Sequence, residues 1–367
     1  MMGDHMKKLL KFIGLFLIVF IFVAASLLGY LTVDEYKPDA IEELEISGEA
    51  SEEIQVGKES TMMIWNIGYG ALGDNADFIM DGGKMVYSAD KERVLENLKA
   101  ISGKVTEVNP DILFLEETDR SSSRSYFIDE LQTIIDQSDS AATNGQNAFA
   151  SNFKVAFVPL PVPPIGKVYA GLGTMSAYNL SSAERYALPC PFSWPLRTIN
   201  LKRCLQVMRA PVSGSDKELV LINLHLEAYD EGEGKIAQTN MLREIMLDEA
   251  NKGNYVIVAG DFNQTFSNID TSMYPRLEGM WESGIINVED FGSSFKFYAD
   301  NTVPTCRSLD KVLIDAADKD PQHFQYYMLD GYIVSSNVVV KEVNTLDLGF
   351  KNSDHNPVVM RFELKAE

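Results

Sequence analysis

The chain has 367 residues, of which 46% are hydrophobic, enough to build a full core in one large domain or two ordinary ones. Its formal net charge is −21 at pH 7. Such a surface repels polyanions at long range, which disfavours processive or sequence-specific nucleic-acid binding without help from metal ions. The three cysteines form no C-x-x-C pair, so the sequence indicates neither a disulfide framework nor a zinc knuckle.

Residues 1–33 are typical of a membrane anchor. Lys7, Lys8 and Lys11 precede an uncharged apolar run over 12–33. At about 1.5 Å per residue this run is long enough to cross a hydrocarbon core of roughly 30 Å. Basic residues before the run and acidic ones after it predict that the start stays inside and the rest lies outside. The alternative is a signal peptide cleaved near the "VAA" at 23–25, which would give a secreted domain.

Residues 34–60 separate this segment from the globular part. Ten acidic residues stand here against two lysines, and the composition predicts a solvated acidic spacer. From residue 61 to 367 short apolar runs alternate with amphipathic stretches, without an internal repeat or a glycine-rich nucleotide loop. We therefore expect one α/β domain over 61–367.

Two helices and a set of strands are predicted within this domain. Val94, Leu98, Ile101, Val105 and Val108 recur at helical spacing and predict a helix near 89–108. A second helix is predicted over 234–252, with Ile236, Leu242, Ile245 and Met246 on its apolar face and Gly253 at its end. The predicted strands are 61–65, 111–115, 154–158, 174–178, 218–223, 254–259, 331–335 and 357–363.

Polar residues stand at the ends of many of these strands. They are Asn66, Glu116 and Glu117, His225, Asp261 and Asn263, Asp330, and the pair Asp354 and His355. Polar groups at strand ends of a layered domain tend to converge on one rim, where loops build sites. Carboxylates, amides and imidazoles without a thiolate suit a hard cation such as Mg²⁺ better than a structural zinc.

Each of these residues also has an ordinary structural explanation. Asn66 precedes two glycines and can be a turn former, and Asp330 beside Gly331 can be turn chemistry. Acidic residues such as Glu117 are favoured near helix starts, and His225 can be a hydrogen-bonded core histidine. The ordered set carries more weight than any single member.

Six motifs in this order resemble the endonuclease/exonuclease/phosphatase superfamily, which includes deoxyribonuclease I, abasic-site endonucleases, neutral sphingomyelinases and inositol-polyphosphate 5-phosphatases. The motifs are "IWNIG" (64–68), "PDILFLEET" (110–118), "LINLHLEA" (221–228), "VAGDFN" (258–263), "LDGYIVS" (329–335) and "SDHNPV" (353–358). The resemblance covers about residues 61–365. It implies a deoxyribonuclease I-like fold, a four-layer sandwich of two mainly antiparallel sheets flanked by helices.

The resemblance also implies a metal-dependent phosphoesterase, a hydrolase of phosphodiesters or phosphomonoesters. Its metal, Mg²⁺ with Mn²⁺ or another divalent cation as alternatives, would be held by Glu117 with help from Asn66 and with Asp354 as an additional ligand. His225, Asp261, Asn263, Asp330 and His355 would be catalytic. Asp330 would orient His355, the candidate base for the attacking water, while Asp261 is the alternative base. His225 would contact the phosphoryl group or protonate the leaving oxygen.

The sequence departs from the family pattern at several points. Glu116 stands where many relatives carry Gln, Gly331 stands where an aromatic residue is common, and residues 71–88 form an insertion that is either a substrate edge or a tolerated loop. The substrate stays open between a lipid head group, a small molecule and DNA. The alternatives to a phosphoesterase of this kind are a nuclease of the same superfamily and a non-catalytic binding module on this fold.

Overall fold

The structure is a computed structural model of the chain and describes residues 2–230 and 232–366. Within these residues, six strands form one mainly antiparallel sheet, here called the smaller sheet, in the order β17-β18-β3-β4-β6-β5. Its strands are β3 (Glu59–Asn66), β4 (Ile112–Asp119), β5 (Gln146–Val158), β6 (Gly166–Ser176), β17 (Val338–Thr345) and β18 (Val358–Leu364). Only the β3–β4 pair among these is parallel.

The larger sheet has the order β1-β7-β8-β9-β10-β16-β13, with β2 paired to β8. Its strands are β1 (Ile41–Glu43), β2 (Ile54–Gln55), β7 (Ser182–Ala187), β8 (Cys204–Ser213), β9 (Glu218–His225), β10 (Tyr255–Asp261), β13 (Phe295–Tyr298) and β16 (Asp330–Ser335). Two short ribbons lie beside it, namely β11 (Gln264–Phe266) with β12 (Gly284–Ile286) and β14 (Cys306–Arg307) with β15 (Tyr326–Tyr327).

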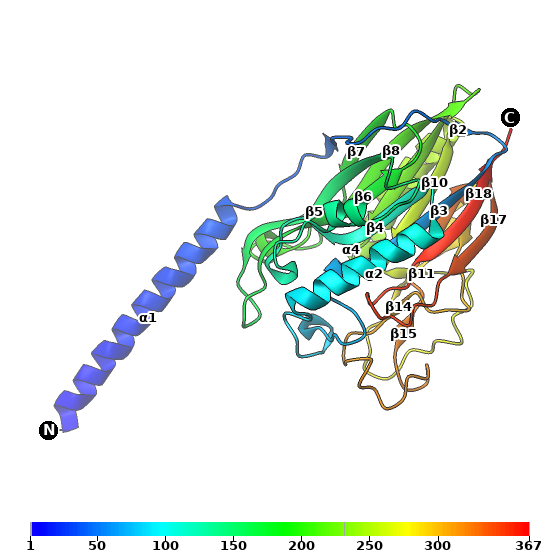
Figure 1. Cartoon of the computed structure of the whole chain (residues 1–367). Coiled ribbons are helices and arrows are strands. Elements are labelled where there is room, and N and C mark those ends of the chain that lie inside the picture. The colour runs from blue at the N-terminus through cyan, green and yellow to red at the C-terminus, as the bar shows by residue number, and fades with distance from the viewer. Residues whose placement is uncertain (1, 231, 367) are drawn as a thin grey trace.

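Helices cover the outer faces of both sheets, which gives four layers (Figure 1). The helices are α1 (Met2–Val33), α2 (Lys91–Val108), α3 (Glu130–Gln137) and α4 (Glu233–Asn251), and the 3-10 turns are η1 (Gly68–Gly70), η2 (Ile79–Asp81), η3 (Ser123–Ser125), η4 (Leu196–Ile199) and η5 (Val288–Phe291). Alternation along the strands sorts the side chains between layers: Met62 and Ile64 of β3 face the other sheet, while Met63 and Trp65 face α2. The predicted four-layer fold is confirmed.

The predicted helix near 89–108 is α2. Asp90 caps its start by accepting a hydrogen bond from the Arg93 amide at 2.8 Å, and Asn109 ends it in a left-handed conformation. In α4 the prediction of Ile236 on the buried face is wrong. Ile236 is exposed, and Gln238 is buried instead because its side chain accepts from the Glu227 amide and donates to the Pro189 carbonyl.

Most side chains of residues 34–60 are exposed, as their composition predicts, but the segment is not a spacer free of the domain. β1 pairs with β7, β2 pairs with β8, and Ser47 bridges to Asn147, so this segment lies along the domain. Apolar residues are interspersed among the acidic ones in this segment. Three of them, Leu44, Ile46 and Ile54, pack in the core between the sheets. The globular fold therefore begins before residue 61 and includes residues 34–58, here called the strap.

We expect Ile54→Ala to lower the free energy of unfolding by about 2–5 kcal/mol, because it leaves a cavity at a side chain that is 1% exposed in the core. Ile41 lies in the same strap but is 52% exposed, so Ile41→Ala is the matched control and should change stability by no more than about 0.5 kcal/mol. Urea unfolding of both variants measures this. Equal, small effects would show that the strap does not contribute to the core.

Candidate active site

The predicted strand-end residues meet at one rim where the two sheets adjoin. The smaller sheet supplies Asn66 from β3 and Glu117 from β4, whose parallel pairing places both carboxyl ends together. In the larger sheet, Asp261 at the end of β10 is opposite His225 on one side and opposite Asp330, where antiparallel β16 begins, on the other. Asp354 and His355 lie in the loop before β18. The pattern of pairing therefore accounts for the convergence.

A chain of acidic and imidazole groups crosses from one sheet to the other. Asp330 Oδ2 lies 2.9 Å from Nδ1 of His355, and Nε2 of His355 lies 3.7 Å from Asp261 Oδ2. The same Asp261 oxygen is 3.4 Å from Nε2 of His225. These four side chains are at most 6% exposed, so little water screens their charges. Both predicted histidines thus face one carboxylate.

Asn66 and Asn263 hold the carboxylates in place. The Asn66 side-chain amide donates to Asp261 at 3.0 Å and to Glu117 at 3.2 Å, while its oxygen accepts from the Gly68 amide. The Asn263 backbone amide donates to Asp261 Oδ1 at 2.8 Å, and its side chain donates to the Leu226 carbonyl. Because the Asn66 nitrogen faces the acids, Asn66 positions Glu117 here, and its role as a metal ligand stays a prediction.

Glu116 and Glu117 lie in different environments. A bulge interrupts the β4–β6 pairing between Leu115 and Thr118, and Glu117 adopts a left-handed φ of 51° there and is half-buried. Glu116 is fully buried, and neither of its carboxylate oxygens has a hydrogen-bond partner on another described residue. Glu117 therefore reaches the rim, whereas Glu116 lies beneath it.

Asp354 is also buried, and a glycine makes room for it. A Cβ on Gly68 would come within 2.6 Å of Asp354 Oδ1, and the φ of Gly68 is +52°. Non-glycine residues with positive φ cluster at the same rim: Tyr69, Glu117 and Asn263. Backbone strain of this kind concentrates at functional sites and costs about 1–3 kcal/mol per residue.

Burial and mutual repulsion raise the pKa values of the acids. Burial, reinforced by Asp330 and Asp261, raises the pKa of Glu116 well above its ordinary value. Burial raises the pKa of Asp261 to about 6 and that of Asp354 to about 7, in each case against the opposing effect of His355. These carboxyl groups lack enough positive charge around them.

The two histidines shift in opposite directions. Burial, with Arg203 nearby, lowers the pKa of His225 well below its ordinary value. Burial alone would also lower the pKa of His355, but Asp330, Cys306 and Asp261 together outweigh that effect and raise it well above the ordinary value. In the protein without a bound metal ion, His225 is thus neutral and His355 is a cation at neutral pH.

Two arginines lie beside the rim, and sequence reasoning missed one of them, Arg124. Arg124 donates to both oxygens of Asp119, and its guanidinium lies 3.7 Å from the centre of the Tyr69 ring. Arg203 donates to the backbone carbonyl of His225 at 3.2 Å. Neither stands in a motif, so only the folded chain brings them to the site. Arg307 is buried and donates to the carbonyls of Leu72, Gly73 and Ala76.

The donor groups fit a divalent cation. The ligand atoms of Asp261, Asp330 and His355 lie within 4.8 Å of one another, and those of Cys306, Asp354 and His355 do as well. The unpartnered carboxylate of Glu116 and the raised pKa values of Asp261 and Asp354 show an excess of buried acid, which a cation would neutralise. Oxygen donors predominate, as Mg²⁺ and Mn²⁺ prefer.

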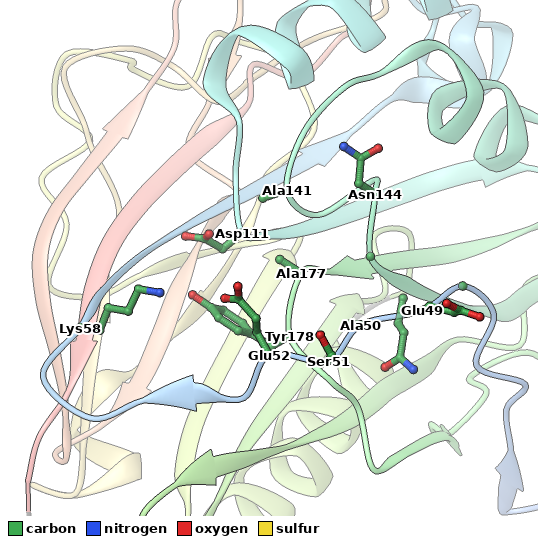
Figure 2. Close-up of a pocket in the computed structure, with 13 residues that line it drawn as sticks. Glu49, Ala50, Ser51, Glu52, Lys58, Asp111, Ala141, Asn144, Ala177 and Tyr178 are labelled. Carbon is green, nitrogen blue, oxygen red and sulfur yellow. The ribbon is translucent and has the colours of Figure 1, made fainter.

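A surface hollow of about 700 Å³ lies elsewhere on the molecule (Figure 2). Lys58 and Asp111, which line it, stand where the chain enters β3 and β4, at the ends opposite to Asn66 and Glu117. None of the predicted site residues lines it. The candidate active site is therefore the rim, where the titratable groups gather, and not this hollow.

Comparison with known proteins gives the family. The model of the Endonuclease/Exonuclease/phosphatase family matches residues 63–331, which include Asn66, Glu117, His225, Asp261 and Asp330. The chain belongs to the endonuclease/exonuclease/phosphatase family. A comparison with curated proteins finds no match. Members of this family are hydrolases of phosphate esters and typically use divalent metals.

Solved structures share the fold at low identity. A Beutenbergia cavernae endonuclease/exonuclease/phosphatase is 17% identical with a TM-score of 0.53, covering 84% of this chain and 72% of its own. D. rerio TDP2, solved with a single-strand DNA product, is 15% identical with a TM-score of 0.50, covering 83% and 99%. The human Nocturnin catalytic domain with bound sulfate is 17% identical with a TM-score of 0.49, covering 88% and 98%.

We expect Asp330→Asn to lower the pKa of His355 in the metal-free protein, because it removes the carboxylate that stabilises the imidazolium. The native pair stabilises the fold fully below the ordinary histidine pKa of about 6.5, and this contribution is lost as pH rises through the raised pKa. NMR titration of the histidine imidazoles measures the pKa of His355 in the native chain and in the variant. An unchanged His355 titration would contradict the pairing, and His225 should stay neutral throughout.

Proposed function

We propose that the chain is a metal-dependent phosphoesterase whose rim binds and hydrolyses a phosphodiester or phosphomonoester. The observation that carries this proposal is the convergence of His225, Asp261, Asp330 and His355 from two sheets into one buried array, with Glu117 and Asp354 beside it. Such an array can position a water molecule, transfer a proton and stabilise charge on a phosphoryl group.

Glu117 and Asp354 would hold the metal ion, with Asn66 positioning Glu117 through its amide. They are close enough that Glu117 contributes to raising the pKa of Asp354. When bound, Mg²⁺ or Mn²⁺ supplies Lewis-acid stabilisation of the charge on the phosphoryl oxygens. The family resemblance is to enzymes with this requirement, and the excess of buried acid supports it here.

The protonation states of Asp261, His355 and His225 indicate which of them accepts a proton and which donates a hydrogen bond. Asp261, with a pKa of about 6, is mostly ionised at neutral pH and is the better base for the attacking water. His355, held as a cation by Asp330, donates a hydrogen bond to the phosphoryl oxygen. Neutral His225, supported from behind by Arg203, lies on the other side of Asp261 and contacts the phosphoryl group or the leaving oxygen. This distribution favours Asp261 over His355, the first candidate from sequence, as the base.

The N-terminal helix supports a membrane location. Residues 5–33 of α1 contain an 18-residue window with a mean hydropathy of 2.8 and are long and apolar enough to cross a membrane, a property shared by anchors and signal sequences. We propose that α1 is retained as an anchor and that the catalytic domain lies outside the cell, since the lysines precede the apolar run and the acids follow it. Lipid head groups and small extracellular phosphate esters are then substrates within reach, and the charge of −21 disfavours long DNA.

A chain beginning at Asp34, which keeps the strap, should hydrolyse at least one member of a panel in the presence of Mg²⁺. The panel is bis(p-nitrophenyl) phosphate, p-nitrophenyl phosphate, sphingomyelin and plasmid DNA. EDTA should abolish release, and His355→Ala should slow it by roughly 10²–10⁴-fold. His323 is exposed and stands in none of the six motifs, so His323→Ala is the control and should retain full rate. Metal binding without any turnover in a wider ester panel would favour a binding module.

We expect the pH dependence of kcat/KM to separate the two candidate bases. If Asp261 is the base, the rate rises as pH increases through about 6 and falls at high pH, where His355 loses its proton. Asp261→Asn should remove the lower limb, and the residual rate should be nearly flat there. A rate that rises only through the raised pKa of His355 would assign the base to His355 instead.

We further expect Glu117→Gln to weaken Mn²⁺ binding at least about tenfold by calorimetry, since it removes a charged oxygen ligand at the rim. Glu116→Gln makes the same chemical change at the neighbouring residue, which lies beneath the rim, and should retain most of the affinity. The reverse order of the two variants would place the metal beneath the rim, against the unpartnered Glu116 carboxylate.

A further inference from the structure

Two loops carry exposed apolar side chains beside the end of α1. The turn of the β5–β6 hairpin, residues 159–165, exposes 64% of Leu160 and 83% of Val162. The β7–β8 loop, residues 188–203, exposes 52% of Trp194 and 58% of Leu196. We call these four side chains the helix-side surface. Figure 1 shows green loops of this part of the chain next to the C-terminal end of α1.

The two loops form one unit. Ile199 of the β7–β8 loop and Ile165 of the hairpin turn both pack against a cluster of Val155, Val158 and Val168 from β5 and β6. The Lys202 backbone amide donates to the Asn152 carbonyl of β5. Because the two loops share these contacts, fixing the position of one loop also fixes the position of the other.

Direct contacts tie this unit to the helix end. Trp194 Nε1 donates to Thr32 Oγ1 at 3.1 Å. Glu35, just beyond the helix, has a side chain that is 3% exposed and forms ion pairs with Arg197 at 3.2 Å and Lys202 at 3.4 Å. These cations neutralise a carboxylate that would otherwise lie at the membrane boundary.

The depth of the helix in a bilayer fixes the height of this surface. At about 1.5 Å per residue, a hydrocarbon core of roughly 30 Å takes about twenty residues, so a span starting at Phe12 ends near Leu31. Thr32, and with it the indole of Trp194, then lies at the membrane–water interface, where tryptophan is enriched. Arg197 and Lys167 are exposed nearby and suit anionic head groups.

We propose that the helix-side surface inserts into the interface of the phospholipid bilayer that α1 crosses, so that the catalytic domain rests on the membrane and does not extend from it on a free tether. The proposal rests on α1 being a retained anchor. Its basis is the continuity of the surface with α1, the exposed apolar side chains at the height of the head groups, and the strap of residues 34–58, which pairs with the domain and leaves no long free linker.

Trp194 itself is the probe for a test on the full chain in phosphatidylcholine/phosphatidylglycerol nanodiscs. The signal of Trp194 is the fluorescence difference between the native chain and Trp194→Phe. The other two tryptophans, Trp65 and Trp281, are present in both chains and cancel in this difference. Discs containing lipids brominated in the acyl chains near the glycerol should reduce this signal by roughly half or more. An equal signal in brominated and plain discs would overturn the proposal.

A second variant separates failure of the surface from failure of the anchor. Phe20→Trp in the Trp194→Phe chain places a probe in the middle of α1, and lipids brominated near the ends of their acyl chains should quench it strongly. Quenching there without quenching of Trp194 leaves the anchor intact and refutes the surface. Absence of quenching at both positions refutes both.

Charged substitutions test the hairpin turn. Leu160→Glu with Val162→Glu should lower the quenching of Trp194, since two carboxylates would lift the loop unit from the bilayer. Ile285 is 72% exposed in β12, outside both loops, so Ile285→Glu is the matched control and should leave the quenching unchanged. Equal quenching in the charged double variant and the control would remove the hairpin turn from the membrane contact.

Discussion

The buried pair of Asp330 and His355 joins the two sheets at the site where chemistry is proposed. Asp330 begins β16 of the larger sheet, and His355 precedes β18 of the smaller sheet. Their 2.9 Å contact therefore exists only when the sheets pack in the correct register. Tyr332, two residues after Asp330, reinforces this packing by donating to the carbonyls of Val358 and Met62 across the interface. Stability and site geometry thus depend on the same sheet-to-sheet contact.

This arrangement has an electrostatic cost that the proposed metal would offset. Glu116, Asp261, Asp330 and Asp354 lie buried near one another, and the pKa values of Glu116, Asp261 and Asp354 are raised. An array of this kind is destabilising for folding alone, because buried carboxylates lose hydration and repel each other. Its presence at one rim, together with strained backbone at Glu117 and Asn263, is the pattern expected of a site arranged for binding and catalysis.

Much of the fold could be predicted from sequence because its signals are local. Helical spacing identified α2, apolar runs identified the central strands, and polar residues at strand ends identified the rim. The strap could not be recognised because its acidic composition masked Leu44, Ile46 and Ile54, whose burial depends on partners far along the chain. The roles of Arg124, Arg203 and Arg307 were also beyond sequence, since each is set by contacts across the fold: an ion pair, one carbonyl and several carbonyls respectively.

Glu116 illustrates the same limit at the site. Strand periodicity could not decide which of two adjacent acids reaches the rim, because a regular strand would simply place them on opposite faces, and only the family resemblance favoured Glu117. The bulge after Leu115 turns Glu117 toward Asn66 and leaves Glu116 beneath Asp261 and Asp330. Gly260 allows this close approach, since a Cβ there would come within 2.2 Å of the Leu224 carbonyl and 3.0 Å of Glu116.

The most direct test of the account is a double-mutant cycle on Mg²⁺-dependent phosphoester hydrolysis. It compares Asp330→Asn, His355→Ala and the double variant with the native chain. If Asp330 acts by orienting and charging His355, the double variant should be no slower than His355→Ala alone, because residues that act as a unit are strongly non-additive. Losses that simply multiply in the double variant would show that the two residues act independently and would contradict the central role of their pairing.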